Sequence, residues 1–195
     1  MASDLTFIYG QRGHKTAFDR YPEIFSETKK ILEYQVPKRI LSFGCSFGEE
    51  CKTLNKYFPE AEIHGLDITS EIIQTNNANN TNAMIHYHDN LAELGDKFDL
   101  IFAMSVLCYW PERRGNYSFQ TFADTIEVID KLLNRGGHLC IYNSKYLSTD
   151  IEICNKRYTV IETEHRETGF VHKYNISGAR VEGYPYFLFQ KENLC

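Results

Sequence analysis

The stretch Ile40-Leu-Ser-Phe-Gly-Cys-Ser-Phe-Gly-Glu-Glu-Cys51 decides the fold that this sequence predicts. Its first four residues are mostly apolar, which is typical of a short buried strand. Small residues then follow at every second position, Gly44, Ser46 and Gly48, and they allow a sharp turn and close approach of a ligand to the main chain. The two glutamates after them open a helix, where acidic side chains suit the positive end of the helix dipole. Strand, glycine turn and helix N-terminus together predict a nucleotide-type binding loop.

A second predicted strand ends in an acid. The segment Glu62-Ile-His-Gly-Leu-Asp67 follows the helix and places a carboxylate at its end. In α/β folds, an acid at this position accepts hydrogen bonds from the hydroxyl groups of a ribose. Dinucleotide-binding proteins and enzymes that use S-adenosylmethionine (SAM) share this device, so the spacing alone leaves both classes open.

Four landmarks, taken in order, resemble those of the class I SAM-dependent methyltransferases. They cover roughly residues 38 to 143, and they are the first motif, the acid after the second strand, the fourth strand and the turn before the fifth strand: Leu41–Gly48, Gly65–Asp67, Lys97–Ala103 and Leu132–Leu139. The run Gly44-Cys-Ser-Phe-Gly-Glu-Glu50 is particularly similar to the chemotaxis-receptor glutamate methyltransferases. In a chain of 195 residues we expect no counterpart of the N-terminal helical domain of those enzymes.

The sequence departs from the family pattern at two positions. Ser42 stands where the family usually has an acid, which weakens a contact to the methionine end of the cofactor. Ser46 stands where the family usually has a glycine, and a serine is tolerated there if the backbone needs no positive φ angle.

The resemblance implies an α/β fold of the Rossmann-like type, a three-layer sandwich around a mostly parallel seven-stranded sheet with an antiparallel last strand. The single domain would comprise an N-terminal lid and helix (1–36), a cofactor-binding core (38–143) and C-terminal antiparallel strands (144–195). In the last part we predict strands over 157–164 and 186–191, with the start of a hairpin near Phe170. A dinucleotide-binding sheet would instead end with a crossover helix, for which the last 30 residues have no room. This favours SAM over NAD.

The resemblance also implies SAM as the cofactor, with S-adenosyl-L-homocysteine (SAH) as its product. Asp67 would hold the ribose, and Asp89 or Asn90, after the third strand, would bond the adenine amino group. Arg12 can pair with the cofactor carboxylate and Tyr9 can cover the methionine portion, although the same segment also fits a frayed terminus. The remaining contacts are expected from Gly44, Cys45, Ser46, Gly48, Ile68 and Met104.

Methyl transfer depends mainly on holding two reactants at near-attack distance. A general base is needed only when the nucleophile keeps a proton at neutral pH, as an alcohol does and a carboxylate does not. The candidates for a base or orienting group are His14, in the N-terminal segment, and Tyr109, after the fourth strand. Tyr109 and Trp110 equally fit aromatic packing of a helix.

The composition is that of an ordinary globular domain, with 43% hydrophobic and 24% charged residues. The net charge of −5 argues against nucleic acid as a partner. No apolar run reaches the length of a membrane span, and no signal peptide is visible. The six cysteines form no Cys-x-x-Cys pair, which favours reduced thiols and a cytoplasmic location.

Several functions remain open at this point. The leading hypothesis is an enzyme that moves a methyl group to an O or N nucleophile, a carboxylate included, of a small molecule or a protein side chain. A methyltransferase-like module that binds without turnover is the alternative, and an NAD-dependent oxidoreductase is the third. His86, His88 and Asp89 could suggest a metal site, but without a further ligand we predict none.

Overall fold

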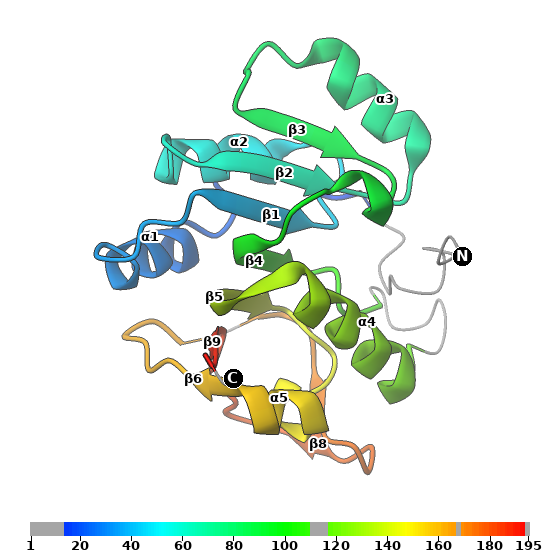
Figure 1. Cartoon of the computed structure of the whole chain (residues 1–195). Coiled ribbons are helices and arrows are strands. Elements are labelled where there is room, and N and C mark those ends of the chain that lie inside the picture. Colours follow the sequence, from blue (N-terminus) through cyan, green and yellow to red (C-terminus); the bar gives the residue numbers. More distant parts are fainter. Residues whose placement is uncertain (1–13, 110–116, 167–168, 194–195) are drawn as a thin grey trace.

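The computed structural model describes residues 14–109, 117–166 and 169–193 (Figure 1). A seven-stranded sheet runs through the described chain in the order β3-β2-β1-β4-β5-β9-β6. Its strands are β1 (Arg39–Phe43), β2 (Glu62–Leu66), β3 (Ile85–His88), β4 (Phe98–Met104), β5 (Leu133–Tyr142), β6 (Tyr158–Val160) and β9 (Leu188–Lys191). The residues after the parallel strands therefore meet at one edge of the sheet, which is where open α/β sheets bind ligands.

Helices cover both faces of the sheet, which confirms the three-layer sandwich (Figure 1). They are α1 (Pro22–Ile31), α2 (Glu49–Tyr57), α3 (Ser70–Asn79), α4 (Phe119–Leu132) and α5 (Glu152–Arg157), with the 3-10 turns η2 (Leu91–Glu93) and η4 (Ser148–Asp150). One hydrophobic core lies between the sheet and α4, and a second lies between the sheet, α1 and α2. Residues of β4 contribute to both cores, because a central parallel strand is buried on both of its faces.

The last strand of the sheet is antiparallel, as the family resemblance implies. Strand β9 lies between β5 and β6 and runs antiparallel to both, with Phe189 opposite Leu139 on one side and opposite Val160 on the other. The other neighbouring strands are parallel. The predicted fold class is therefore confirmed.

The C-terminal region differs in detail from the prediction. The strand expected over 157–164 is shorter, because α5 continues to Arg157 and β6 spans only Tyr158–Val160. The hairpin near Phe170 is a two-residue pair, β7 (Lys173–Tyr174) with β8 (Arg180–Val181), and it lies outside the main sheet.

Helix α1 positions the residues directly before it at the ligand edge of the sheet. Pro22 stands in its first turn, where the backbone needs no donor. Ile24, Phe25 and Thr28 form its buried face, and the Phe25 ring packs on Phe102 of β4 at a centroid distance of 5.3 Å. This packing fixes the position of Tyr21, directly before the helix. Within the described residues, no helix combines the length and the apolar character that a membrane span requires.

Candidate functional site

A cavity of about 530 Å³ opens at the ligand edge of the sheet, within the range of small-molecule sites. One wall comes from residues that follow β1, β2 and β4, among them Gly44, Asp67 and Ser105. The opposite wall is the segment from His14 to Tyr21, together with Phe170. The cavity therefore lies where the glycine turn and the acid after the second strand were predicted to meet.

The glycine turn adopts a left-handed backbone at three positions. The φ angles are 86° at Gly44, 50° at Ser46 and 79° at Gly48. Ser46 therefore has the positive φ angle for which the family uses glycine. The condition under which a serine is easily tolerated, a backbone without a positive φ angle, is not met. Two bonds hold the strained residue, because its N–H donates to Asp67 Oδ2 (2.9 Å) and its carbonyl accepts from Asn76 Nδ2 (2.8 Å).

Asp67 is buried at the cavity wall, directly after β2. Its Oδ2 accepts from Ser46 N and its Oδ1 accepts from the N–H of Thr69 at 3.0 Å. These bonds fix the carboxylate next to the glycine turn. Each carboxylate oxygen keeps a second lone pair, so Asp67 can accept hydrogen bonds from a ligand while it is held in place.

Glu50, which the sequence reading assigned only to the helix dipole, lines the same cavity. The hydroxyl of Ser42 donates to its Oε1 at 2.7 Å. Burial raises the pKa of Glu50 to about 8, although the hydrogen bond from Ser42 and the charge of Arg20 act in the opposite direction. The sequence contained a signal for this role of Glu50. Ser42 replaces the acid that the family usually has, and the helix that begins after the turn has acids in its first turn, which can occupy the same place.

Three polar side chains meet at the exits of β4 and β5. Asn143 Nδ2 donates to Ser105 Oγ (2.9 Å) and to Tyr21 Oη (3.3 Å), and the two hydroxyl groups are 2.9 Å apart. Ser105 and Asn143 both have φ angles of 58°, and such strained residues cluster at functional sites. Tyr21 and Ser105 line the cavity. Burial raises the pKa of the Tyr21 phenol, so it keeps its proton at neutral pH.

The basic residues of the cavity come from the N-terminal segment. His14, Lys15 and Arg20 line it, and the Arg20 guanidinium lies over the rings of Tyr21 and Phe170 at 5.0 and 5.9 Å. His14 Nδ1 is 3.3 Å from Ser46 Oγ. The described lining therefore takes its acids, Glu50 and Asp67, from residues that follow β1 and β2, and its bases from the N-terminal segment.

The structure brings together His14, Gly44, Cys45, Ser46, Asp67, Ile68 and Met104, the predicted site residues that line the cavity. Gly48 lies at the end of the turn, where a Cβ would come within 2.5 Å of Tyr87 Oη. Asn90 accepts a hydrogen bond from Ala92 N at the start of η2, and neither it nor Asp89 lines the cavity.

The remaining predicted residues stand apart from the cavity or outside the described chain. Tyr109 is half-buried and packs against the core on the α4 side of the sheet. Tyr9 and Arg12 lie outside the described residues.

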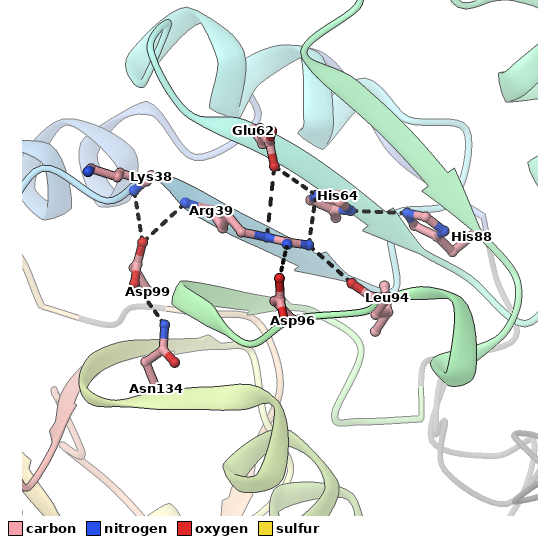
Figure 2. Close-up of polar contacts among 9 residues, drawn as sticks. All are labelled: Lys38, Arg39, Glu62, His64, His88, Leu94, Asp96, Asp99 and Asn134. Atoms are coloured by element: carbon pink, nitrogen blue, oxygen red, sulfur yellow. Dashed lines mark hydrogen bonds and ion pairs between the residues drawn. The ribbon is translucent and has the colours of Figure 1, made fainter.

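Of the two histidines considered as metal ligands, His88 belongs to a polar network between the strands (Figure 2), and the ring of His86 lies 5.0 Å from that of His64. His64 Nδ1 lies 3.1 Å from His88 Nε2, and Arg39 Nη2 lies 3.3 Å from His64 Nε2. Arg39 also approaches Glu62 and Asp96. In the part of the chain that the structure describes, no three His, Cys, Asp or Glu side chains are placed to hold a metal ion.

Comparison with known proteins places the chain among methyltransferases. The family model described as "Methyltransferase domain" matches residues 41–139. The trans-aconitate 2-methyltransferase of Deinococcus radiodurans is 23% identical over 99 residues, which cover 49% of this chain and 38% of the relative. The chain therefore spans well under half the length of this curated relative.

Two methyltransferases are among the solved structures that are similar to this chain. The N-methyltransferase NodS from Bradyrhizobium japonicum, in complex with SAH, has a TM-score of 0.52 and 16% identity, covering 87% of this chain and 86% of that one. The SAM-bound amino pentose methyltransferase CalS10 from Micromonospora echinaspora has a TM-score of 0.47 and 18% identity, covering 65% and 50%. The NodS comparison supports the same fold over most of both chains.

Proposed function

Because the chain belongs to the methyltransferase-domain family, whose model covers half of it, we propose that it transfers a methyl group from SAM to an oxygen or nitrogen nucleophile. The acceptor is a small molecule or a protein side chain, and SAH is the product. The membership expected from the sequence motifs is confirmed. The transfer itself, its cofactor and its acceptor are the proposal.

The observation that carries the proposal is the buried Asp67 carboxylate, held beside the glycine turn at the cavity wall. A carboxylate fixed after the second strand suits the two hydroxyl groups of a ribose. The turn supports this fit, because Gly44 lines the cavity and leaves the main chain without a side chain where the nucleoside would approach. SAM supplies a methyl group already activated by a positively charged sulfur.

Glu50 fits the methionine end of the same ligand. In the family an acid at the position of Ser42 approaches that end, and here Ser42 instead holds Glu50 in the cavity wall. A buried carboxyl group ionises more readily beside a positive charge. The α-ammonium group of SAM therefore adds a positive charge to that of Arg20, which alone leaves the pKa of Glu50 raised.

The residues that line the cavity act by binding and orienting. Asp67 and Glu50 fix the two ends of the cofactor, and the N-terminal segment closes the opposite side and restricts water. Most of the rate enhancement then comes from proximity. His14 and Tyr109 remain our candidates for a base or orienting group. The five described cysteines are buried thiols, which fits a cytoplasmic location.

Isothermal titration calorimetry with SAM, SAH and NAD tests the proposal. We expect SAM and SAH to bind and NAD not to bind. Asp67→Ala should weaken the binding of SAH by about 1–3 kcal/mol, since it removes hydrogen bonds to a charged group. Asp96→Ala is the matched control, because its carboxylate is 95% exposed and lies outside the cavity lining.

Two outcomes would count against this assignment. Binding of NAD with no binding of SAM would support the oxidoreductase, and unchanged affinity in Asp67→Ala would remove Asp67 from the site. Conversion of bound SAM to SAH in the presence of a metabolite pool separates an active enzyme from a module that only binds.

A further inference from the structure

We propose that Tyr21 and Ser105, held in place by Asn143, form the acceptor-binding wall of the cavity, and that this wall and the charges beside it select an acceptor bearing a carboxylate. The inference rests on the proposed function and names the substrate class of the same site. It starts from the placement of the three residues. Ser105 and Asn143 follow β4 and β5 at the ligand edge, and Tyr21 reaches them from the start of α1.

The hydrogen atoms of the cluster can be counted. Asn143 Nδ2 has two N–H groups, and it donates to Ser105 Oγ and to Tyr21 Oη. The bond between the two hydroxyl groups uses one hydroxyl hydrogen. One hydroxyl hydrogen therefore remains, on Tyr21 or on Ser105, and both residues line the cavity. By the same count one hydroxyl lone pair also remains, so the wall offers a ligand one donor and one acceptor, and the donor suits a carboxylate oxygen.

The charges around the cluster point to the same class of acceptor. Arg20 lies beside Tyr21 and uses one of its N–H groups on the carbonyl of Lys15 (2.7 Å), which leaves the others for a ligand. Lys15 also lines the cavity. The acids of the described lining, Glu50 and Asp67, are already assigned to the cofactor. An anion beside Tyr21 therefore meets positive charge.

A carboxylate acceptor also agrees with the protonation state of the cluster. Tyr21 keeps its proton because burial raises its pKa, so it donates a hydrogen bond and does not act as a base. One carboxylate oxygen forms a bond to the transferred methyl carbon, the bond from that carbon to sulfur breaks, and its electron pair stays on sulfur as a neutral thioether. No proton moves, and the ester product is neutral and loses its attraction to Arg20.

The hydrogen count gives a specific expectation for variants. Tyr21→Phe leaves the hydroxyl of Ser105 free to donate, and Ser105→Ala leaves that of Tyr21, so each single variant keeps one donor. The double variant keeps neither hydroxyl, and the amide of Asn143, which is fully buried, does not line the cavity. We expect the single variants to bind a carboxylate within about threefold of the wild type, and the double variant to bind it about tenfold more weakly.

The experiment uses the SAH complex of the full chain and a panel of small probes, benzoate, cinnamate and citrate, each with its primary amide. Ligand-observed NMR measures their binding at millimolar concentration. The acids should bind more tightly than the amides. Arg20→Gln, a change at an exposed side chain, should weaken the acids and leave the amides unchanged. The hydroxyl pair of Ser148 and Tyr184, 3.0 Å apart and outside the cavity lining, provides the matched control variants.

The affinity of each variant for SAH separates the two levels of the argument. Failure of all variants and of the wild type to bind SAH overturns the proposed function. Normal SAH binding with no preference for acids, or with a double variant that binds acids as well as the wild type, overturns the inference alone. If the double variant misfolds and loses SAH binding, the Arg20→Gln variant decides whether the site prefers carboxylates. Equal effects of this change on acids and amides would contradict the inference.

Discussion

At the scale of single residues, the cavity is lined by two carboxyl groups, those of Asp67 and Glu50, which have different hydrogen-bond partners. Backbone N–H groups hold both oxygens of Asp67. Glu50 receives one hydroxyl hydrogen bond, and burial raises its pKa to about 8. Asp67 is therefore fixed before a ligand binds. Glu50 instead gains a positive charge beside it when the α-ammonium group of the ligand arrives. The two residues should respond differently when parts of the cofactor are removed.

Glu50→Gln tests this difference, because it keeps the size of the side chain and removes its ability to ionise. We expect SAH to bind about 1.5–3 kcal/mol more weakly at pH 8. 5′-Methylthioadenosine, which lacks the amino acid portion, should bind equally to both proteins. Calorimetry measures both ligands. Glu49→Gln is the control, since Glu49 pairs with Lys52 at 2.6 Å in the same helical turn and does not line the cavity.

Equal losses for SAH and 5′-methylthioadenosine would show that Glu50 supports the fold of the turn and does not contact the ammonium group. No loss for either ligand would place the methionine portion elsewhere.

The residues that the sequence predicted are those whose role is visible in a local pattern. The glycine turn and Asp67 follow directly from strand ends and small residues. Tyr21 could not be found this way, since its partners Ser105 and Asn143 lie 84 and 122 positions away in the chain. The left-handed backbone of Ser46 was also not predictable, because tertiary hydrogen bonds to Asp67 and Asn76 hold it.

At the scale of elements, strands β2 and β3 are joined by a pair of uncharged histidines. Burial, together with the charges of Arg39 and of the neighbouring histidines, lowers the pKa of His64 to about 3. Burial also lowers the pKa of His88. The rings stack at 5.3 Å with an interplanar angle of 12°. A proton on either ring would bring positive charge beside Arg39 (Figure 2).

The sign of the pH effect follows from these pKa values. The unfolded chain takes up a proton at His64 near pH 6.5, while the folded chain resists until about pH 3. The contribution to stability is therefore complete above pH 6.5 and is lost as the pH falls toward 3. We expect the free energy of unfolding to fall by about 1 kcal/mol more in the wild type than in His64→Gln between pH 7.5 and pH 5, with solvent screening included.

Urea unfolding at the two pH values measures this difference. His172→Gln, a change at an exposed histidine, should leave the pH dependence of the wild type intact. If His64→Gln shows the same pH dependence as the wild type, the pair has no part in the acid sensitivity of the sheet.

The order of elements was predictable because strands, turns and helices alternate regularly up to β5. The C-terminal part was predicted less well. The sequence around Arg157 favours a strand by composition, but the helix α5 extends to that residue, and its Nη1 donates to Asp130 of α4 at 2.9 Å. A contact with a distant helix thus sets the boundary, and no local pattern contains that information.

At the scale of the whole molecule, the two walls of the cavity belong to distant parts of the chain. The sheet edge supplies one wall, and the segment 14–21 with Phe170 supplies the other. A ligand that contacts both walls binds the folded state only, and it should therefore stabilise the entire domain.

Thermal unfolding with SAH tests this expectation. At a concentration 100 times the dissociation constant, SAH should add about 2.7 kcal/mol of stability. For a domain of this size, the melting temperature should rise by roughly 5–10 °C. NAD at the same concentration should cause no shift. A rise with NAD equal to that with SAH would contradict a cavity specific for the sulfonium cofactor and its product.

The inserted position of β9 has a consequence for biosynthesis. Strand β6 pairs with β9 and with no other strand of the sheet, yet it leaves the ribosome before β9 does. Until residues 188–191 emerge, β5 has an open hydrogen-bonding edge and β6 has no partner. A nascent chain paused in this interval would offer that edge to chaperones or to other nascent chains, so the sheet is most exposed to misassembly between the emergence of β6 and that of β9.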